Sequence, residues 1–172
     1  MQSAKSNLVL IGMPGSGKST VGIILAKRTA RDFVDTDLLI QTSRQRSLQQ
    51  IMDSEGYIAL REIEAKVILR LNVHNHVIAT GGSAVYSTAA MACLKHDGMC
   101  IFLDVAAEIL RARISDYETR GIARRPEQSF TQLFAERRDL YLKYADLTID
   151  CGRLNQDEVC DAIIAAIGGR YS

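Results

Sequence analysis

The sequence predicts an α/β fold in which helices cover both faces of a five-stranded parallel sheet. Short apolar runs alternate with longer segments whose apolar residues recur every three or four positions, which is the pattern of parallel strands joined by helices. The 172 residues, 47% of them hydrophobic and 24% charged, suit one core-forming domain. We therefore expect a single domain over residues 1–172.

The expected elements follow one another along the whole chain. Strands are expected at residues 8–11, 33–35, 77–80, 99–103 and 147–149, and the order places two helices between the second and the third. Helical patterns cover residues 18–29, 47–71, 88–95, 106–114, 131–144 and 157–167. We find no internal repeat and no low-complexity tract.

A phosphate-binding loop follows the first expected strand. Residues 12–20, GMPGSGKST, match G-x-x-x-x-G-K-[ST] at the start of a helix, where backbone N–H groups and the helix dipole favour an anion. Lys18 is placed to reach the terminal phosphates and Ser19 to hold Mg²⁺. The expected nucleotide-binding residues are Gly15, Ser16, Gly17, Lys18, Ser19 and Thr20. The pattern predicts a three-layer P-loop NTPase fold that binds a nucleoside triphosphate.

Carboxylates follow the second and the fourth expected strands. Asp35 and Asp37 lie at the sheet edge where open α/β proteins bind ligands, and they can serve Mg²⁺ and a hydroxyl-bearing acceptor. A plainer alternative is that Asp37 caps the next helix. Asp104 looks superficially like a Walker B aspartate, but the helix expected from residue 106 favours capping.

Two short motifs have a functional and a structural interpretation. Arg61 and Glu64 share a helix face, so Glu64 could orient the guanidinium toward a carboxylate or phosphate, although a solvated pair is the commoner outcome. Gly81 and Gly82 directly follow the third strand. They would let a ligand approach the backbone closely, and an ordinary turn would need the same flexibility.

Residues 115–129 are rich in arginine and poor in apolar anchors, and they include Asp116, Arg120, Arg124 and Arg125. An ordinary solvated loop between two helices would have the same composition. In a phosphate-binding protein such a segment can close over the transferred group, exclude water and neutralise charge. We therefore expect a mobile lid.

Composition argues against several other classes. The formal net charge of +1 gives no general attraction to nucleic acid or membrane. Cys93, Cys100, Cys151 and Cys160 form no C-x-x-C pair and have no histidine at ligand spacing, so free thiols are expected. Neither a signal-peptide pattern nor an apolar run of membrane-spanning length is present. We expect a cytoplasmic protein with no nucleic-acid or membrane partner.

Taken in order, the motifs resemble those of the shikimate kinase family over nearly the whole chain. They are the loop at 12–20, Asp35-x-Asp37, Arg61-x-x-Glu64, Gly81-Gly82, Arg125-Pro126, and Arg137 four residues before Tyr141. The resemblance implies a nucleoside-monophosphate-kinase-like fold with a mobile lid, and a monomer. It also implies transfer of the γ-phosphate of ATP, with Mg²⁺, to the 3-hydroxyl of shikimate, a step in chorismate and aromatic amino-acid biosynthesis.

The resemblance implies roles at the nucleotide side. Lys18 would contact the β- and γ-phosphates, Ser19 would ligate Mg²⁺, and Asp35 would hold the metal through water. Arg113 would stack on adenine, and the region of Arg153 would line the other side of the base.

At the acceptor side, the resemblance implies that Asp37 orients the hydroxyl, either as a general base that also deprotonates it or through orientation alone, which is enough for a loose transition state. Arg61 and Arg137 would grip the acceptor carboxylate, with backbone contacts from Gly81 and Gly82.

In the lid, the same resemblance has Arg125 swing toward the transferred phosphate. The chain departs from the family pattern at five positions near the family's motifs. These are Tyr57, Leu60, Ser83, Glu127 and Gln128, where the pattern has glutamate, phenylalanine, glycine and two leucines.

Other functions fit parts of the pattern. The acceptor could be another small hydroxy acid such as gluconate, or a nucleoside monophosphate. A nucleotide switch is a further alternative, because residues 53–56 spell D-x-x-G, but that match lies within a helical pattern and no N-K-x-D motif occurs.

Overall fold

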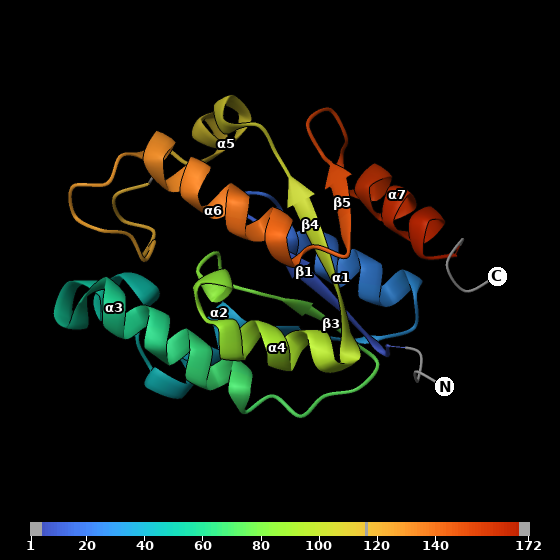
Figure 1. Cartoon of the computed structure of the whole chain (residues 1–172), viewed down its shortest axis with the longest axis horizontal. Coiled ribbons are helices and arrows are strands. Elements are labelled where there is room, and N and C mark those ends of the chain that lie inside the picture. The colour runs from blue at the N-terminus through green and yellow to red at the C-terminus, as the bar shows by residue number, and fades with distance from the viewer. Residues whose placement is uncertain (1–4, 116, 169–172) are drawn as a thin grey trace.

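The computed structural model describes residues 5–115 and 117–168. These residues contain one sheet of five parallel strands in the order β2-β3-β1-β4-β5 (Figure 1). The strands are β1 (Asn7–Ile11), β2 (Asp32–Asp35), β3 (His76–Ala79), β4 (Gly98–Asp104) and β5 (Leu147–Asp150). The predicted strands are confirmed, with boundaries that differ by at most one residue at either end. Asp116 of the expected lid lies outside the described residues.

Burial explains why these strands were recognisable. Every residue of β1 is buried, and so is every residue of β4 except Asp104 at its end, because helices cover both faces of the central strands. The outer strand β2 has no buried residue, and β5 has only Ile149. The edge strands therefore carry a weaker apolar signal.

Helices form the two outer layers of the fold. Their bounds are α1 (Lys18–Arg28), α2 (Thr36–Arg44), α3 (Leu48–Leu69), α4 (Thr88–Asp97), α5 (Ala107–Arg113), α6 (Phe130–Tyr144) and α7 (Gln156–Gly168). Helices α1 and α7 pack against each other on one face, and α4 and α6 lie on the other (Figure 1). A 3₁₀ turn, η1 (Ala84–Tyr86), was not predicted. None of the helices within the described residues is long and apolar enough to cross a bilayer.

Helices α2 and α3 build a wall beside the sheet. Helix α3 begins with a capping box in which Ser47 and Gln50 satisfy each other's backbone N–H groups. The continuous helix expected over residues 47–71 is interrupted at Gly56, whose φ of 85° is non-helical. A second buried cluster, separate from the main core, fills the space inside this wall. Its members are Ile40, Ile51, Leu60, Ile63 and Ala123.

The topology places the candidate site. The chain leaves β1 toward β2 on one side and leaves β3 toward β4 on the other, so the crevice at the carboxyl ends of β1 and β3 is a topological switch point. The phosphate loop follows β1, and Gly81 and Gly82 follow β3. The sheet order therefore brings these two motifs together.

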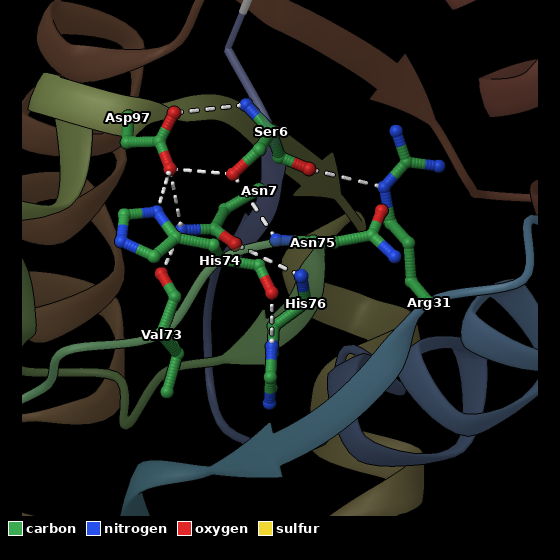
Figure 2. A network of polar contacts seen from close by, with 8 residues as sticks. All are labelled: Ser6, Asn7, Arg31, Val73, His74, Asn75, His76 and Asp97. Atoms are coloured by element: carbon green, nitrogen blue, oxygen red, sulfur yellow. Dashed lines mark hydrogen bonds and ion pairs between the residues drawn. The ribbon is translucent and has the colours of Figure 1, made fainter.

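A polar network ties the opposite, amino ends of the strands (Figure 2). Asp97, at the end of α4, accepts hydrogen bonds from the backbone N–H and hydroxyl of Ser6 and contacts the His74 ring at 2.8 Å. The Ser6 hydrogen bonds lower the pKa of Asp97 to about 2, so the carboxylate stays charged. Asn7 links Val73 and His76 to the same network. These contacts pin the α4–β4 corner to β1 and β3, far from the phosphate loop.

Candidate active site

The phosphate loop curls between β1 and α1. Gly15 and Gly17 have φ values of 81° and 92°, which side chains with a Cβ rarely adopt. A Cβ on Gly15 would also lie 2.8 Å from Cγ1 of Ile114. The loop and the start of α1 open onto a pocket of about 320 Å³ that is also lined by Asp37, Arg113 and Arg120.

Lys18 is buried beneath this loop. Its ammonium donates to the carbonyl oxygens of Gly12 and Met13, both at 2.8 Å, and more weakly to the Ser16 hydroxyl at 3.4 Å. Burial lowers the pKa of Lys18 to about 8. The side chain is a desolvated cation held at the base of an anion-binding loop.

Ser19 and Asp35 offer two oxygens side by side at the edge of the pocket. The Ser19 hydroxyl donates to Oδ2 of Asp35. The other Asp35 oxygen caps α2 by accepting from the N–H groups of Asp37 (2.9 Å) and Leu38 (3.2 Å). Asp35, and not Asp37, is thus the helix cap, which corrects the capping alternative. A hydroxyl and a carboxylate beside a phosphate site are a donor set that fits Mg²⁺.

Asp37 and Glu64 approach each other across Gly81. A Cβ on Gly81 would collide with Oδ1 of Asp37 and with Oε1 of Glu64. Burial, followed by the nearby Asp35 carboxylate, raises the pKa of Asp37 to about 6. Burial, followed by Asp37, raises the pKa of Glu64 to about 7. A side chain at position 81 would therefore displace at least one of these two carboxyl groups.

Glu64 does not orient Arg61, contrary to the interpretation of their spacing. Its Oε2 accepts a hydrogen bond from the Ser83 hydroxyl, and its buried Oε1 has no hydrogen-bond partner among the described residues. Arg61 instead stacks on the Tyr86 ring, with Cζ 3.6 Å from the ring centroid. Tertiary partners thus replace the local pair.

Replacing Glu64 by Gln is expected to stabilise the protein at pH 8 but not at pH 5. The folded pKa of about 7 lies above the ordinary value of 4.5, so folding favours the protonated form and stability falls as pH rises through that interval. A glutamine carries no such penalty, and the gain at pH 8 should be on the order of 1–3 kcal/mol.

Thermal unfolding of both proteins at the two pH values measures this effect. Glu62→Gln, at an exposed position of the same helix, is the matched control. Equal stability differences at pH 5 and pH 8 would contradict the assigned cause.

Arg61 and Arg137 converge on one backbone carbonyl. The Nη2 atoms of Arg61 and Arg137 donate to the Ala123 oxygen at 3.2 Å and 2.7 Å. The Nε atoms of both arginines are buried and have no partner in the described part of the chain. A Cβ on Gly82 would lie 2.6 Å from Nη1 of Arg137. Two guanidiniums with unused donors therefore meet at the Ala123 carbonyl, and that of Arg137 also lies beside Gly82.

The acceptor cavity, as we name it, lies between these groups and the segment at residues 117–129, which we call the lid segment. The cavity holds about 70 Å³. Its lining includes Asp37, Glu64, Gly82, Ser83, Arg137 and residues 120–123 of the lid segment. The Gly121 N–H donates to Oε1 of Gln49 on α3 at 2.7 Å, so the lid segment is docked over the cavity.

Arg120 and Asp37 line both the acceptor cavity and the phosphate pocket, so they stand at the junction of the two. Arg125, the lid residue singled out from the sequence, lies elsewhere and donates to Glu136 at 3.2 Å. Arg113 borders the phosphate pocket and donates to the Gly15 carbonyl at 3.4 Å. Arg153 is exposed in the turn after β5 and does not line that pocket.

Several neighbours of the site were not singled out from the sequence. Tyr86 lies four residues after Gly82, and Glu136 immediately precedes Arg137, so proximity to known motifs was their only signal. Asp104, expected as a helix cap, instead forms a two-point ion pair with Arg138 at 2.7 and 3.3 Å. Leu60 packs in the second buried cluster, and Tyr57 lies 5.1 Å from the Arg61 guanidinium.

Comparisons with known proteins agree with this geometry. A model of the shikimate kinase family matches residues 14–168. The shikimate kinase of Rippkaea orientalis is 38% identical over 164 residues, which cover 94% of this chain and 85% of that protein.

Solved structures give the same likeness. The shikimate kinase of Acinetobacter baumannii, solved in complex with shikimate, superposes with a TM-score of 0.88 at 28% identity, covering 96% of this chain and 94% of that one. The shikimate kinase of Aquifex aeolicus gives a TM-score of 0.82 at 32% identity, with coverage of 96% and 98%. The fold prediction is thereby confirmed.

Proposed function

The chain belongs to the shikimate kinase family, and we propose that it transfers the γ-phosphate of ATP to the 3-hydroxyl of shikimate. The observation that carries this proposal is a pair of guanidiniums, one on the half-buried Arg61 and one on the buried Arg137, whose buried Nε donors lack partners within the described residues. Buried unpaired donors favour an anion, and guanidinium groups suit a carboxylate. An acceptor with one carboxylate and a hydroxyl would place its carboxylate against the guanidiniums and its hydroxyl near Asp37.

The phosphate loop, Lys18 and Asp37 each have a separate role in the proposed transfer. The loop amides of Gly15, Ser16 and Gly17 hold the phosphates, with Thr20 at the helix start, and Lys18 leaves its loop carbonyls to neutralise charge on the transferred group. Asp37, with a pKa of about 6, is a carboxylate at neutral pH and accepts the proton of the acceptor hydroxyl.

Ser19 and Asp35 would hold Mg²⁺, since their oxygens already lie in contact. When bound, the ion would neutralise phosphate charge and hold the triphosphate in line with the acceptor. Arg113 remains our proposed neighbour of adenine, and the geometry adds no support for Arg153 on the other side of the base.

The lid segment accounts for substrate entry. A cavity of about 70 Å³ is far smaller than the ~300 Å³ at which ligand sites usually begin, so the lid segment must move to admit an acceptor. When the lid segment closes again, Arg120 lies between the acceptor and the phosphates. A positive charge at this place stabilises the negative charge of the phosphoryl group during transfer. Arg125 can take part only after it leaves Glu136.

Measurement of ADP release with Mg-ATP against a panel of acceptors tests the function. We expect stimulation by shikimate, and none by gluconate or by nucleoside monophosphates. Arg137 in the cavity lining and Arg61, which meets it at the Ala123 oxygen, offer two guanidiniums for a single carboxylate. Gluconate also carries one carboxylate, so it is the stringent comparison. Turnover with gluconate but not with shikimate would overturn the acceptor assignment.

We further propose that the protein works as a cytoplasmic monomer without nucleic-acid or membrane partners. The near-zero formal charge of +1 supports the absence of nucleic-acid and membrane partners, because it gives no general attraction to phosphate backbones or anionic lipids. Light scattering of the purified protein, with and without substrates, tests the monomer.

A further inference from the structure

Tyr86 and Glu136 form a contact that the proposed transfer does not use. The Tyr86 hydroxyl, on η1, donates to Oε1 of Glu136 on α6. The ring of Tyr86 lies 3.6 Å from the Cζ atom of Arg61 and 5.5 Å from that of Arg137. Glu136 is thus connected through a single aromatic side chain to Arg61 and to Arg137, and Arg137 lines the acceptor cavity.

The second oxygen of Glu136 contacts the lid segment. Its Oε2 accepts hydrogen bonds from Nη2 of Arg125 and from Nε2 of Gln128, each at 3.2 Å. Gln128 is 4% exposed, so its contact with Glu136 is partly buried, whereas the Arg125 side chain is 57% exposed. One carboxylate therefore joins the lid segment to the wall of the acceptor cavity.

The charge of Glu136 suits this double contact. The Tyr86 hydrogen bond lowers the pKa of Glu136, so the side chain is a carboxylate at neutral pH. Tyr86, Arg125 and Gln128 each donate a hydrogen bond to it, and a carboxylate only accepts. An exposed ion pair with Arg125 alone would contribute little, but the contacts with Tyr86 and Gln128 are partly buried. An amide at this position has a single accepting oxygen and no charge, so it either faces the Arg125 and Gln128 donors with its NH2 group or requires the Tyr86 hydroxyl to reverse its role and accept.

Resting on the proposed function, we propose that Glu136 is a positioning residue that sets the Tyr86 ring beneath Arg61 and holds the lid segment over the acceptor cavity. Acceptor affinity and lid docking then change together when Glu136 is altered. Neither effect requires Glu136 to touch the acceptor or the nucleotide.

Glu136→Gln and Tyr86→Phe test this coupling in the full chain. Phenylalanine keeps the ring under Arg61 and removes only the hydroxyl. We expect the shikimate KM to rise about fivefold in each variant, the effect of losing one hydrogen bond, with the ATP KM unchanged. In the double variant the KM should rise no further, because both substitutions break the same link.

Limited trypsin digestion of the ligand-free protein gives a readout that needs no activity. Cleavage after Arg120 and Arg124, followed by mass spectrometry, reports how firmly the lid segment is docked. We expect initial cleavage at these bonds to be about fivefold faster in Glu136→Gln than in the wild type.

Tyr117→Phe is the matched control, because the Tyr117 hydroxyl is buried without a hydrogen-bond partner among the described residues. It should change neither lid cleavage nor the shikimate KM. Wild-type lid cleavage in Glu136→Gln would overturn the proposal, as would multiplying KM effects in the double variant or an equal rise in both KM values. If the wild type does not phosphorylate shikimate, the proposed function fails, and the digestion alone still decides whether Glu136 holds the lid segment.

Discussion

Replacing Lys18 by Ala is expected to lower kcat by about 10³-fold or more, because the ammonium is a preorganised positive charge at the transferred phosphate. Its present position supports this expectation. The side chain is 8% exposed and is held by two loop carbonyls, so it needs only a short rearrangement to reach a phosphate in the adjoining pocket.

The same substitution should leave the fold intact. Burial lowers the pKa of Lys18 to about 8, which means that the folded state tolerates the cation poorly at neutral pH. An alanine removes that cost, although it leaves the carbonyls of Gly12 and Met13 without this donor.

Single-turnover phosphoryl transfer and thermal unfolding separate the two expectations. Lys27→Ala, at an exposed position in the last turn of the same helix, is the control and should behave like the wild type in both measurements. Turnover of Lys18→Ala at the wild-type rate would refute the role of the lysine.

Replacing Arg137 by Ala is expected to raise the shikimate KM by about 10- to 100-fold, the effect of losing hydrogen bonds between charged groups. Arg137 is 1% exposed and faces Gly82 within the acceptor cavity. Since the phosphate pocket does not include Arg137, the ATP KM should change by about twofold at most.

The next residue of α6 provides an internal control. Arg138 pairs with Asp104 and does not line the acceptor cavity, so Arg138→Ala should leave the shikimate KM close to the wild-type value. Steady-state kinetics with each substrate varied in turn would show the difference. If both alanine variants raised the shikimate KM equally, Arg137 would have no special role in binding the acceptor carboxylate.

Motifs that depend on backbone conformation were predictable. The phosphate loop needs glycines at positions 15 and 17 for its positive φ values, and its strand and helix are adjacent in the chain. Strands β1 and β4 were predictable from the sequence because strands buried on both faces need a nearly unbroken run of apolar residues. The break at Gly56 was missed because the apolar pattern of α3 continues on both sides of it.

The partners of the charged side chains were not predictable in the same way. Arg61 and Glu64 satisfy the spacing of a helical pair, yet Glu64 contacts Ser83 and Arg61 lies on Tyr86. Asp104 precedes a helix, but its partner is Arg138, which is 34 residues away. In each case a group from another element reaches the charge.

Near neighbours in the chain dictate the curl of the phosphate loop, the run of each central strand and the capping boxes of α3 and α6, so these could be inferred from residue order. Three features arise only when α2, α3 and α6 pack around β3. They are the convergence of Arg61 and Arg137 on Ala123, the approach of Asp37 to Glu64, and the attachment of the lid segment to Glu136. The reason is physical. Backbone geometry follows from local sterics, whereas a charge removed from water takes whichever partner the folded chain brings nearest.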